Sequence, residues 1–208
     1  MSWRGSAVAA LVVATILAGC SEDVRPASGA GNAPPASASA SASASAAPPA
    51  AEDWGDPAPA AAGGKSAPAC ALPVAFDVAS KWTAKAVGAD AAAAFGGPDT
   101  VACEVDGKPA GIIGFIRVYV AKVADPRAAL QEHLTRATKA DGQRFRQITT
   151  PAGAGWEVGY QDEDSPVRAF AVPAGSGTVV VEWGGLDEEE HRAGLPAYGL
   201  ARASLARS

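Results

Sequence analysis

The chain of 208 residues contains few of the side chains that usually carry chemistry: two histidines, three cysteines and one methionine. Aromatic residues make up only 6% of it, and the 17 basic residues are outnumbered by 22 acidic ones. A protein that binds nucleic acid normally presents clustered lysine and arginine side chains to the phosphate backbone. We therefore expect no nucleic-acid partner.

Motifs of common enzyme classes are also missing. The sequence has no phosphate-binding GxxxxGK[ST] loop and no GxGxxG dinucleotide fingerprint. The serine in AGSGT, residues 174–178, lacks the GxSxG setting of a hydrolase nucleophile. We predict that the protein is not an enzyme and has no catalytic residue and no cofactor. A weakly marked envelope enzyme is the alternative.

Neither histidine has the sequence context of a metal ligand. His133 lies beside the apolar stripe of a predicted helix, where a boundary position is the simplest interpretation. His191 follows three glutamates at the start of another predicted helix, where acidic residues complement the helix dipole. A metal site at Glu188, Glu189 and His191, or calcium at the acidic residues 162–164, is less favoured, and we predict no metal site.

No apolar run approaches the 20 or so residues that a membrane-spanning helix needs. The run at residues 7–18 follows Arg4 and has the length of a signal-peptide core. It ends in the motif LAGC, which resembles a bacterial lipobox and includes Cys20. We predict a lipoprotein signal peptide at residues 1–19 and a lipid-modified Cys20 that anchors the protein without a spanning helix. A short uncleaved anchor is the alternative.

Residues 20–69 have almost no core-forming side chains. The stretch ASASASASASAA at residues 36–47 is of low complexity, and proline pairs stand on both sides of it. Such a segment buries too little apolar surface to offset the entropy lost on folding. We predict a disordered linker over residues 20–69, and we expect Trp54 within it to be exposed rather than docked.

Two cysteines remain after Cys20, and both belong to the predicted domain at residues 70–208. An even number of cysteines in an exported protein usually forms disulfides. We predict a bond between Cys70 and Cys103, which would add about 3–4 kcal/mol by closing a loop of about 30 residues. A metal pair or free thiols are the alternatives, although no other ligand stands at zinc-like spacing.

The pattern of residues 70–208 predicts an α+β domain. The run at residues 110–123 is apolar on both faces, which is typical of a central strand. Asp125 and Pro126 then have the chemistry of a helix start. Four strand-like runs joined by turn-forming residues predict an antiparallel meander. A last helix begins at Asp187 with a capping box to Glu190, and Pro196 should kink or restart it.

The remaining large side chains have two interpretations each. The tryptophans are expected in the core, with a ligand surface as the alternative. Four arginines on predicted strands are expected on the solvated side of the sheet, with a face for an acidic partner as the alternative. These residues are Trp82, Trp156 and Trp183 for the first group and Arg117, Arg144, Arg146 and Arg168 for the second.

The lipobox, ACALPVAFDVASKW, VACEVDGKPAGIIGFIRVYV and EEHRAGLPAYGLARASL together resemble a group of actinobacterial (Streptomyces-type) lipoproteins. This group is related to the LpqN-type lipoproteins and to the PsbP-like fold. The resemblance implies an antiparallel sheet flanked by two main helices, and it implies an accessory or binding role. It brings no catalytic motif with it.

We therefore expect a non-enzymatic binding or accessory module, anchored by Cys20 on the extracytoplasmic face of the cell membrane. Its partner would be an envelope protein or ligand that the sequence does not identify. The alternative is a lipid or glycan carrier, which an apolar cavity lined by Phe115, Tyr119 or the tryptophans would favour. A cleft that joins His133 or His191 to carboxylates would favour an enzyme instead.

Overall fold

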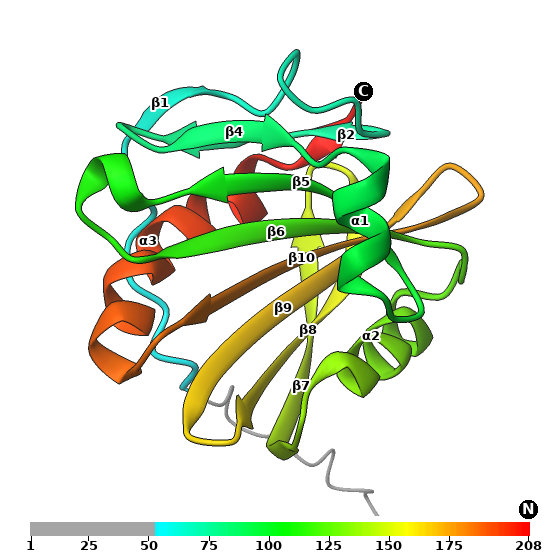
Figure 1. The fold of residues 1–208 in the computed structure, drawn as a ribbon. Coiled ribbons are helices and arrows are strands. Elements are labelled where there is room, and N and C mark those ends of the chain that lie inside the picture. Colours follow the sequence, from blue (N-terminus) through cyan, green and yellow to red (C-terminus); the bar gives the residue numbers. More distant parts are fainter. Residues whose placement is uncertain (1–52) are drawn as a thin grey trace, which may run out of the picture. The chain divides into compact units, whose positions relative to one another are not determined.

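The computed structural model of the protein describes residues 53–208. The predicted signal peptide, Cys20 and the linker as far as residue 52 lie outside the described residues. Within residues 53–208, the chain forms a seven-stranded antiparallel sheet that has helices on both faces (Figure 1). The α+β class that the sequence predicts is therefore confirmed.

The sheet consists of two meanders that join edge to edge. Its spatial order is β4-β5-β6-β10-β9-β8-β7, and β6 pairs antiparallel with β10. The four strand-like runs after the first predicted helix do form a meander, as expected. The strands are β4 (Thr83–Ala86), β5 (Thr100–Asp106), β6 (Gly114–Ala121), β7 (Ala140–Thr150), β8 (Gly153–Asp162), β9 (Ser165–Ala174) and β10 (Gly177–Gly185).

Two helices cover parts of the front face in Figure 1. The short helix α1 (Ala89–Phe95), which the sequence analysis did not anticipate, packs on β5. Helix α2 (Pro126–His133) packs on β8, β9 and β10. The Asp125 side chain accepts a hydrogen bond from the backbone N of Ala128 at 2.7 Å, which confirms the predicted helix start. The helix continues for one more turn as the 3-10 helix η2 (Leu134–Arg136).

Helix α3 (Glu188–Ser204) covers the back face. Asp187 caps it by accepting from the backbone N of Glu190 at 2.9 Å, but the Glu190 side chain bonds to Ile113 instead of completing a capping box. Pro196 does not end the helix, which is continuous through it. Gly194 lets α3 approach the sheet, because a Cβ there would stand 2.0 Å from the Trp183 ring.

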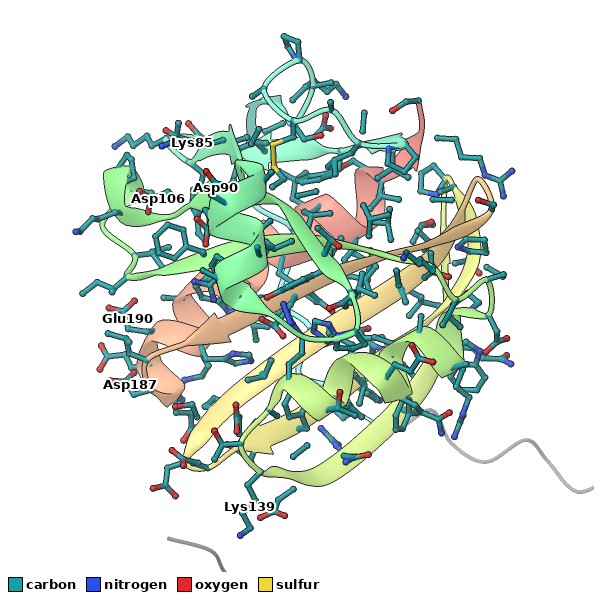
Figure 2. All side chains as sticks on the ribbon, turned by 45° about the vertical axis from the view of Figure 1, so that its right-hand side comes forward. Lys85, Asp90, Asp106, Lys139, Asp187 and Glu190 are labelled. Atoms are coloured by element: carbon teal, nitrogen blue, oxygen red, sulfur yellow. A yellow bond between two sulfur atoms is a disulfide. The ribbon has the colours of Figure 1, made fainter. Side chains whose placement is uncertain are left out.

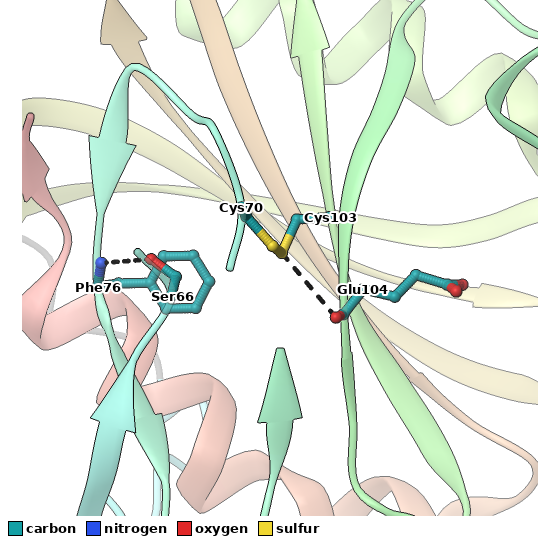
Figure 3. Close-up of a disulfide and its surroundings, with 5 residues drawn as sticks. All are labelled: Ser66, Cys70, Phe76, Cys103 and Glu104. Atoms are coloured by element: carbon teal, nitrogen blue, oxygen red, sulfur yellow. Dashed lines mark hydrogen bonds between the residues drawn. A yellow bond between two sulfur atoms is a disulfide. The ribbon is translucent and has the colours of Figure 1, made fainter. Parts of the chain in front are cut away.

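The sheet separates two hydrophobic clusters. The cluster under α3 contains Trp82, Trp183, Phe170 and Tyr198, which confirms a core position for two of the three tryptophans. Trp156 lies on the other face and is partly buried against the cluster under α2. The core under α3 also contains a Cys70–Cys103 disulfide, whose Cα atoms are 5.7 Å apart (Figure 3).

The N-terminal part of the domain extends further than the sequence indicated. Strand β1 (Ala62–Lys65) pairs with β3 (Asp77–Ala79), although residues up to 69 were expected to be linker. The Ser66 hydroxyl accepts a hydrogen bond from the backbone N of Phe76 at 3.1 Å, beside the disulfide (Figure 3). The segment has few apolar side chains of its own, so the strand pairing and this hydrogen bond hold it on the domain.

Three further short elements complete the described structure. Strand β2 (Val74–Ala75) pairs with β11 (Ala206–Arg207), which attaches the C-terminal residues to the segment between β1 and β3. The 3-10 helix η1 (Lys108–Ala110) connects β5 to β6. Between Asp53 and β1 the chain has no regular secondary structure, but it packs on the domain through Trp54.

Candidate functional site

Two glutamates are buried on opposite faces of the sheet. Glu157 on β8 is fully buried beneath α3. Glu182 on β10 lies on the face that α1 and α2 partly cover, and 17% of its side chain is exposed. A buried carboxylate must be paired or hydrogen-bonded to remain charged. The partners of each glutamate therefore show whether its hydrogen-bonding capacity is filled within the chain.

Glu157 is at the centre of a cluster that includes three arginines. Arg146 on β7 donates from Nε at 2.7 Å, Arg168 on β9 from Nη2 at 2.6 Å, and Arg202 on α3 from Nη1 at 2.6 Å. The hydroxyl of Tyr198 donates to the same carboxylate at 3.0 Å. Both oxygens of Glu157 are thus satisfied by side chains from two strands and a helix.

The segment before β1 closes this cluster. Asp56 accepts hydrogen bonds from Arg146, Arg168 and Arg202 at 2.6–3.0 Å, and these bonds hold its pKa well below the usual range although burial acts to raise it. The Trp54 ring lies 4.3 Å from the Arg146 guanidinium and is only 9% exposed. We call these residues, Glu157, Asp56, Trp54, Tyr198 and the three arginines, the Glu157 cluster.

The arginines and Trp54 overturn two expectations. Arg146 and Arg168 are not on a solvated face, because each is paired with Glu157 and Arg168 is only 6% exposed. Arg117 lies with Glu104, Phe95 and Phe115, apart from the other arginines. Trp54 is buried rather than exposed, because three guanidiniums surround its ring.

On the other face, Glu182 is joined to His133. The His133 ring on α2 is fully buried between two carboxylates, with Nδ1 2.6 Å from Asp99 and Nε2 2.7 Å from Glu182. The expected boundary position for His133 is therefore wrong. Both ring nitrogens must donate to satisfy two ionised carboxylates, so the ring carries a positive charge.

The ionisation states follow from this geometry. Burial acts to lower the pKa of His133, but the hydrogen bonds that the ring donates to Asp99 and Glu182 outweigh it and raise the pKa to about 9. Burial acts to raise the pKa of Glu182, yet the bond to His133 lowers it below the usual value. Near neutral pH, His133 is therefore protonated and Glu182 is a carboxylate.

Two buried tyrosines also contact Glu182. The hydroxyls of Tyr119 and Tyr160 lie 3.4 Å and 3.5 Å from its carboxylate oxygens, at the long limit of a hydrogen bond. Burial, and after it the charge of Glu182, raises the pKa of both tyrosines, so their hydroxyls stay protonated. A ligand at this position meets one negative charge and two hydroxyl groups.

Glu182 forms the floor of a groove that opens to solvent. Two hollows of about 420 Å³ and about 470 Å³ meet there, and Asp162, Val167 and Glu182 line both of them. The first extends to Phe95, Tyr119, Arg136 and Tyr160, and the second to Ile113, Phe115, Arg117 and Leu186. We call this surface the Glu182 groove. His133 does contact two carboxylates, but of these three residues only Glu182 lines the groove.

The other sequence-predicted candidates lie elsewhere. His191 is buried at the start of α3, where burial and then the charge of Arg168 lower its pKa to about 4. Asp162 ends β8, and Glu163 and Asp164 form the turn to β9, so the acidic residues 162–164 do lie at a hairpin tip, as expected. Among residues 53–208, no group of three or more ligating side chains is placed to hold a metal ion.

Sequence reasoning missed Asp99, Glu157 and Glu182. Each glutamate is a single carboxylate inside an otherwise apolar strand, in GWEVGY and TVVVEWGG. That pattern was the available signal, because a lone charge in a buried strand requires a partner. The partners themselves could not be inferred, since Asp99 is 34 residues from His133 and Asp56 is 112 residues from Arg168.

Comparison with known proteins places the chain in a family. No helix in the described part of the chain is both long enough and apolar enough to cross a membrane. No curated protein sequence matches the chain. A model of an uncharacterised lipoprotein family matches residues 36–205, which is most of the sequence. The chain therefore belongs to this lipoprotein family, and both that membership and the Cys70–Cys103 disulfide indicate an extracytoplasmic protein anchored to a membrane.

Proposed function

We propose that the protein is a non-enzymatic binding module of the cell envelope and that it binds its partner in the Glu182 groove. A lipid on Cys20 would hold it on the extracytoplasmic face of the cell membrane. The observation that carries the proposal is Glu182 itself, a partly exposed carboxylate kept ionised by a buried, protonated histidine. The relationship to LpqN-type, PsbP-like lipoproteins is part of this proposal, and the antiparallel sheet between helices supports it.

The charge states of the groove support binding over catalysis. A general base must reach the substrate and have a pKa near the working pH. His133 has no exposed surface, both of its nitrogens are engaged, and it is already protonated. Glu182 has no proton to donate, and its lowered pKa makes it a weak general base. A fixed charge that does not exchange a proton is suited to holding a ligand.

The carrier hypothesis has less support. The space between the sheet and α3 is filled by Trp183, Tyr198 and Phe170, each at most 1% exposed. Tyr119 and Phe115 do line hollows, but these are open, and the charged side chains of Arg136, Arg117 and Glu182 share them. An apolar lipid tail needs a more enclosed and less polar cavity.

Photo-crosslinking in intact cells tests the proposal. A photoreactive phenylalanine analogue replaces Phe115 in the groove, and in a matched strain it replaces Ser176, which is exposed at the opposite end of β10. We expect a discrete crosslinked product from position 115 that is missing from position 176. The same products from both positions, or none from position 115, would contradict the proposal.

The anchor is tested separately. Replacing Cys20 with serine should abolish incorporation of a labelled fatty acid, because the thiolate is the attachment point of the lipid. Cys103→Ser in the same host is the control and should keep the label. Persistent labelling of the Cys20→Ser chain would show that the lipid is attached elsewhere.

A further inference from the structure

We infer that the Glu182 groove binds a segment of another envelope protein in which lysine or arginine side chains alternate with apolar ones. This inference rests on the proposed function, because it names the class of partner for the same groove. It follows from two independent properties of the surface, which are its exposed apolar side chains and its excess of unpaired carboxylates.

The exposed apolar side chains of the domain gather at the groove. In the part of the chain that the structure describes, five large apolar side chains are exposed, and all except Val120 line the groove. They are Leu186 (68% exposed), Ile113 (49%), Phe95 (42%) and Phe115 (36%). Scattered apolar residues need no explanation, but a group at one concave surface marks an interaction site. The partner must therefore bring apolar side chains of its own.

The groove is also acidic. Three carboxylates and two guanidiniums line it. Glu182 is paired with His133, and both guanidiniums are paired with carboxylates outside the lining, which leaves the charges of Asp162 and Glu163. Arg117 bonds to Glu104 at 2.8 Å, and Arg136 lies 3.3 Å from Asp99. Neither Asp162 nor Glu163 forms an ion pair with any of the described residues. The uncompensated charge that a partner meets is therefore negative.

Further carboxylates stand beside the exposed apolar pair Ile113 and Leu186. Glu190 accepts a hydrogen bond from the backbone N of Ile113 at 3.0 Å, and Asp187 follows Leu186 directly. Figure 2 shows Glu190 and Asp187 close together on the same side of the molecule. A basic segment is attracted to such a surface, whereas an anionic lipid surface or an acidic peptide is repelled.

Three labelled peptides of equal length test the inference on the full mature chain in detergent. Their sequences are acetyl-Leu-Lys-Phe-Lys-Leu-amide and the versions in which glutamine or glutamate replaces both lysines. Fluorescence anisotropy measures the affinity of each. We expect the lysine peptide to bind about tenfold more tightly than the glutamine peptide at about 0.05 M salt, with the difference shrinking at about 0.5 M.

Two variants that change the net charge equally show whether the groove is responsible. Glu163→Gln removes a negative charge at the groove, and Ser176→Lys adds a positive charge at the opposite end of β10. We expect Glu163→Gln to weaken the lysine peptide about threefold and Ser176→Lys to have a much smaller effect. Leu186→Ser should weaken all three peptides, because it removes an exposed apolar contact.

The outcomes separate this inference from the proposed function. Equal affinity for the lysine and glutamine peptides, with loss on Leu186→Ser, would overturn the basic partner but leave the groove as a binding surface. Tighter binding of the glutamate peptide, or no binding of any peptide, would also overturn the inference. The proposed function fails only if position 115 gives no crosslink of its own in cells.

Discussion

The Glu157 cluster and the Glu182 groove each place a glutamate on a central sheet, but only the first is completed by the chain itself. Three arginines and a tyrosine saturate Glu157, and Asp56 accepts hydrogen bonds from the same three arginines. Glu182 has a single charged partner, and its two tyrosine contacts are long. A buried charge therefore does not mark a binding site by itself. Glu182 marks one because its carboxylate has hydrogen-bonding capacity that the chain does not fill.

The comparison predicts that the two glutamates differ in their contribution to stability. Glu157→Gln leaves three guanidiniums and only one carboxylate, so we expect it to lower the free energy of unfolding by about 3–5 kcal/mol. Glu182→Gln leaves His133 paired with Asp99, and we expect a loss of about 1–2 kcal/mol. Urea denaturation of both variants measures the difference. Equal losses would contradict the distinction between a closed and an open site.

The contribution of the segment before β1 to the Glu157 cluster can be tested separately. Trp54→Ala deletes a buried ring that three guanidiniums surround, and we expect a loss of about 3 kcal/mol in thermal or urea unfolding. Phe95→Ala at the edge of the groove is the control, because its side chain is 42% exposed and its loss should cost much less. A Trp54→Ala protein as stable as the wild type would show that the segment is not part of the domain.

The pH dependence of stability should report on His133. Its pKa is raised from 6.5 to about 9 on folding, so the stabilisation is complete below about pH 6.5 and is lost as the pH rises through 9. We expect a decrease of about 1–3 kcal/mol between these values. His133→Gln should remove most of this dependence. A flat profile in the wild-type chain would mean that His133 is not held between two carboxylates.

Local signals in the sequence were sufficient for much of the fold. Asp125 and Pro126 determine the start of α2 through the chemistry of a helix N-terminus, and the apolar pattern of β6 identifies a central strand. The turn-forming residues that separate the strands from β7 to β10 indicate the meander, which is again a local signal. Each of these features depends on neighbours within a few residues.

The candidate site depends on contacts between residues far apart in the sequence, and no local pattern reveals such contacts. His133 meets Asp99 and Glu182 only because α2 folds over β10, and the loop before β5 returns to the same point. Trp54 stands in a segment whose composition indicates a linker, yet distant arginines bury it. The sequence pointed to neither contact, because a charged residue's partner can be anywhere along the chain.

The most direct test of the distinction between the two regions is carboxylate labelling with a carbodiimide and an amine, read out by mass spectrometry. Purified full-length protein is compared with protein in intact cells. We expect Glu163 to be labelled in the purified protein and protected in cells, Asp125 at the far end of α2 to be labelled in both, and Glu157 in neither. Equal labelling of Glu163 in both samples, or ready labelling of Glu157, would contradict the account.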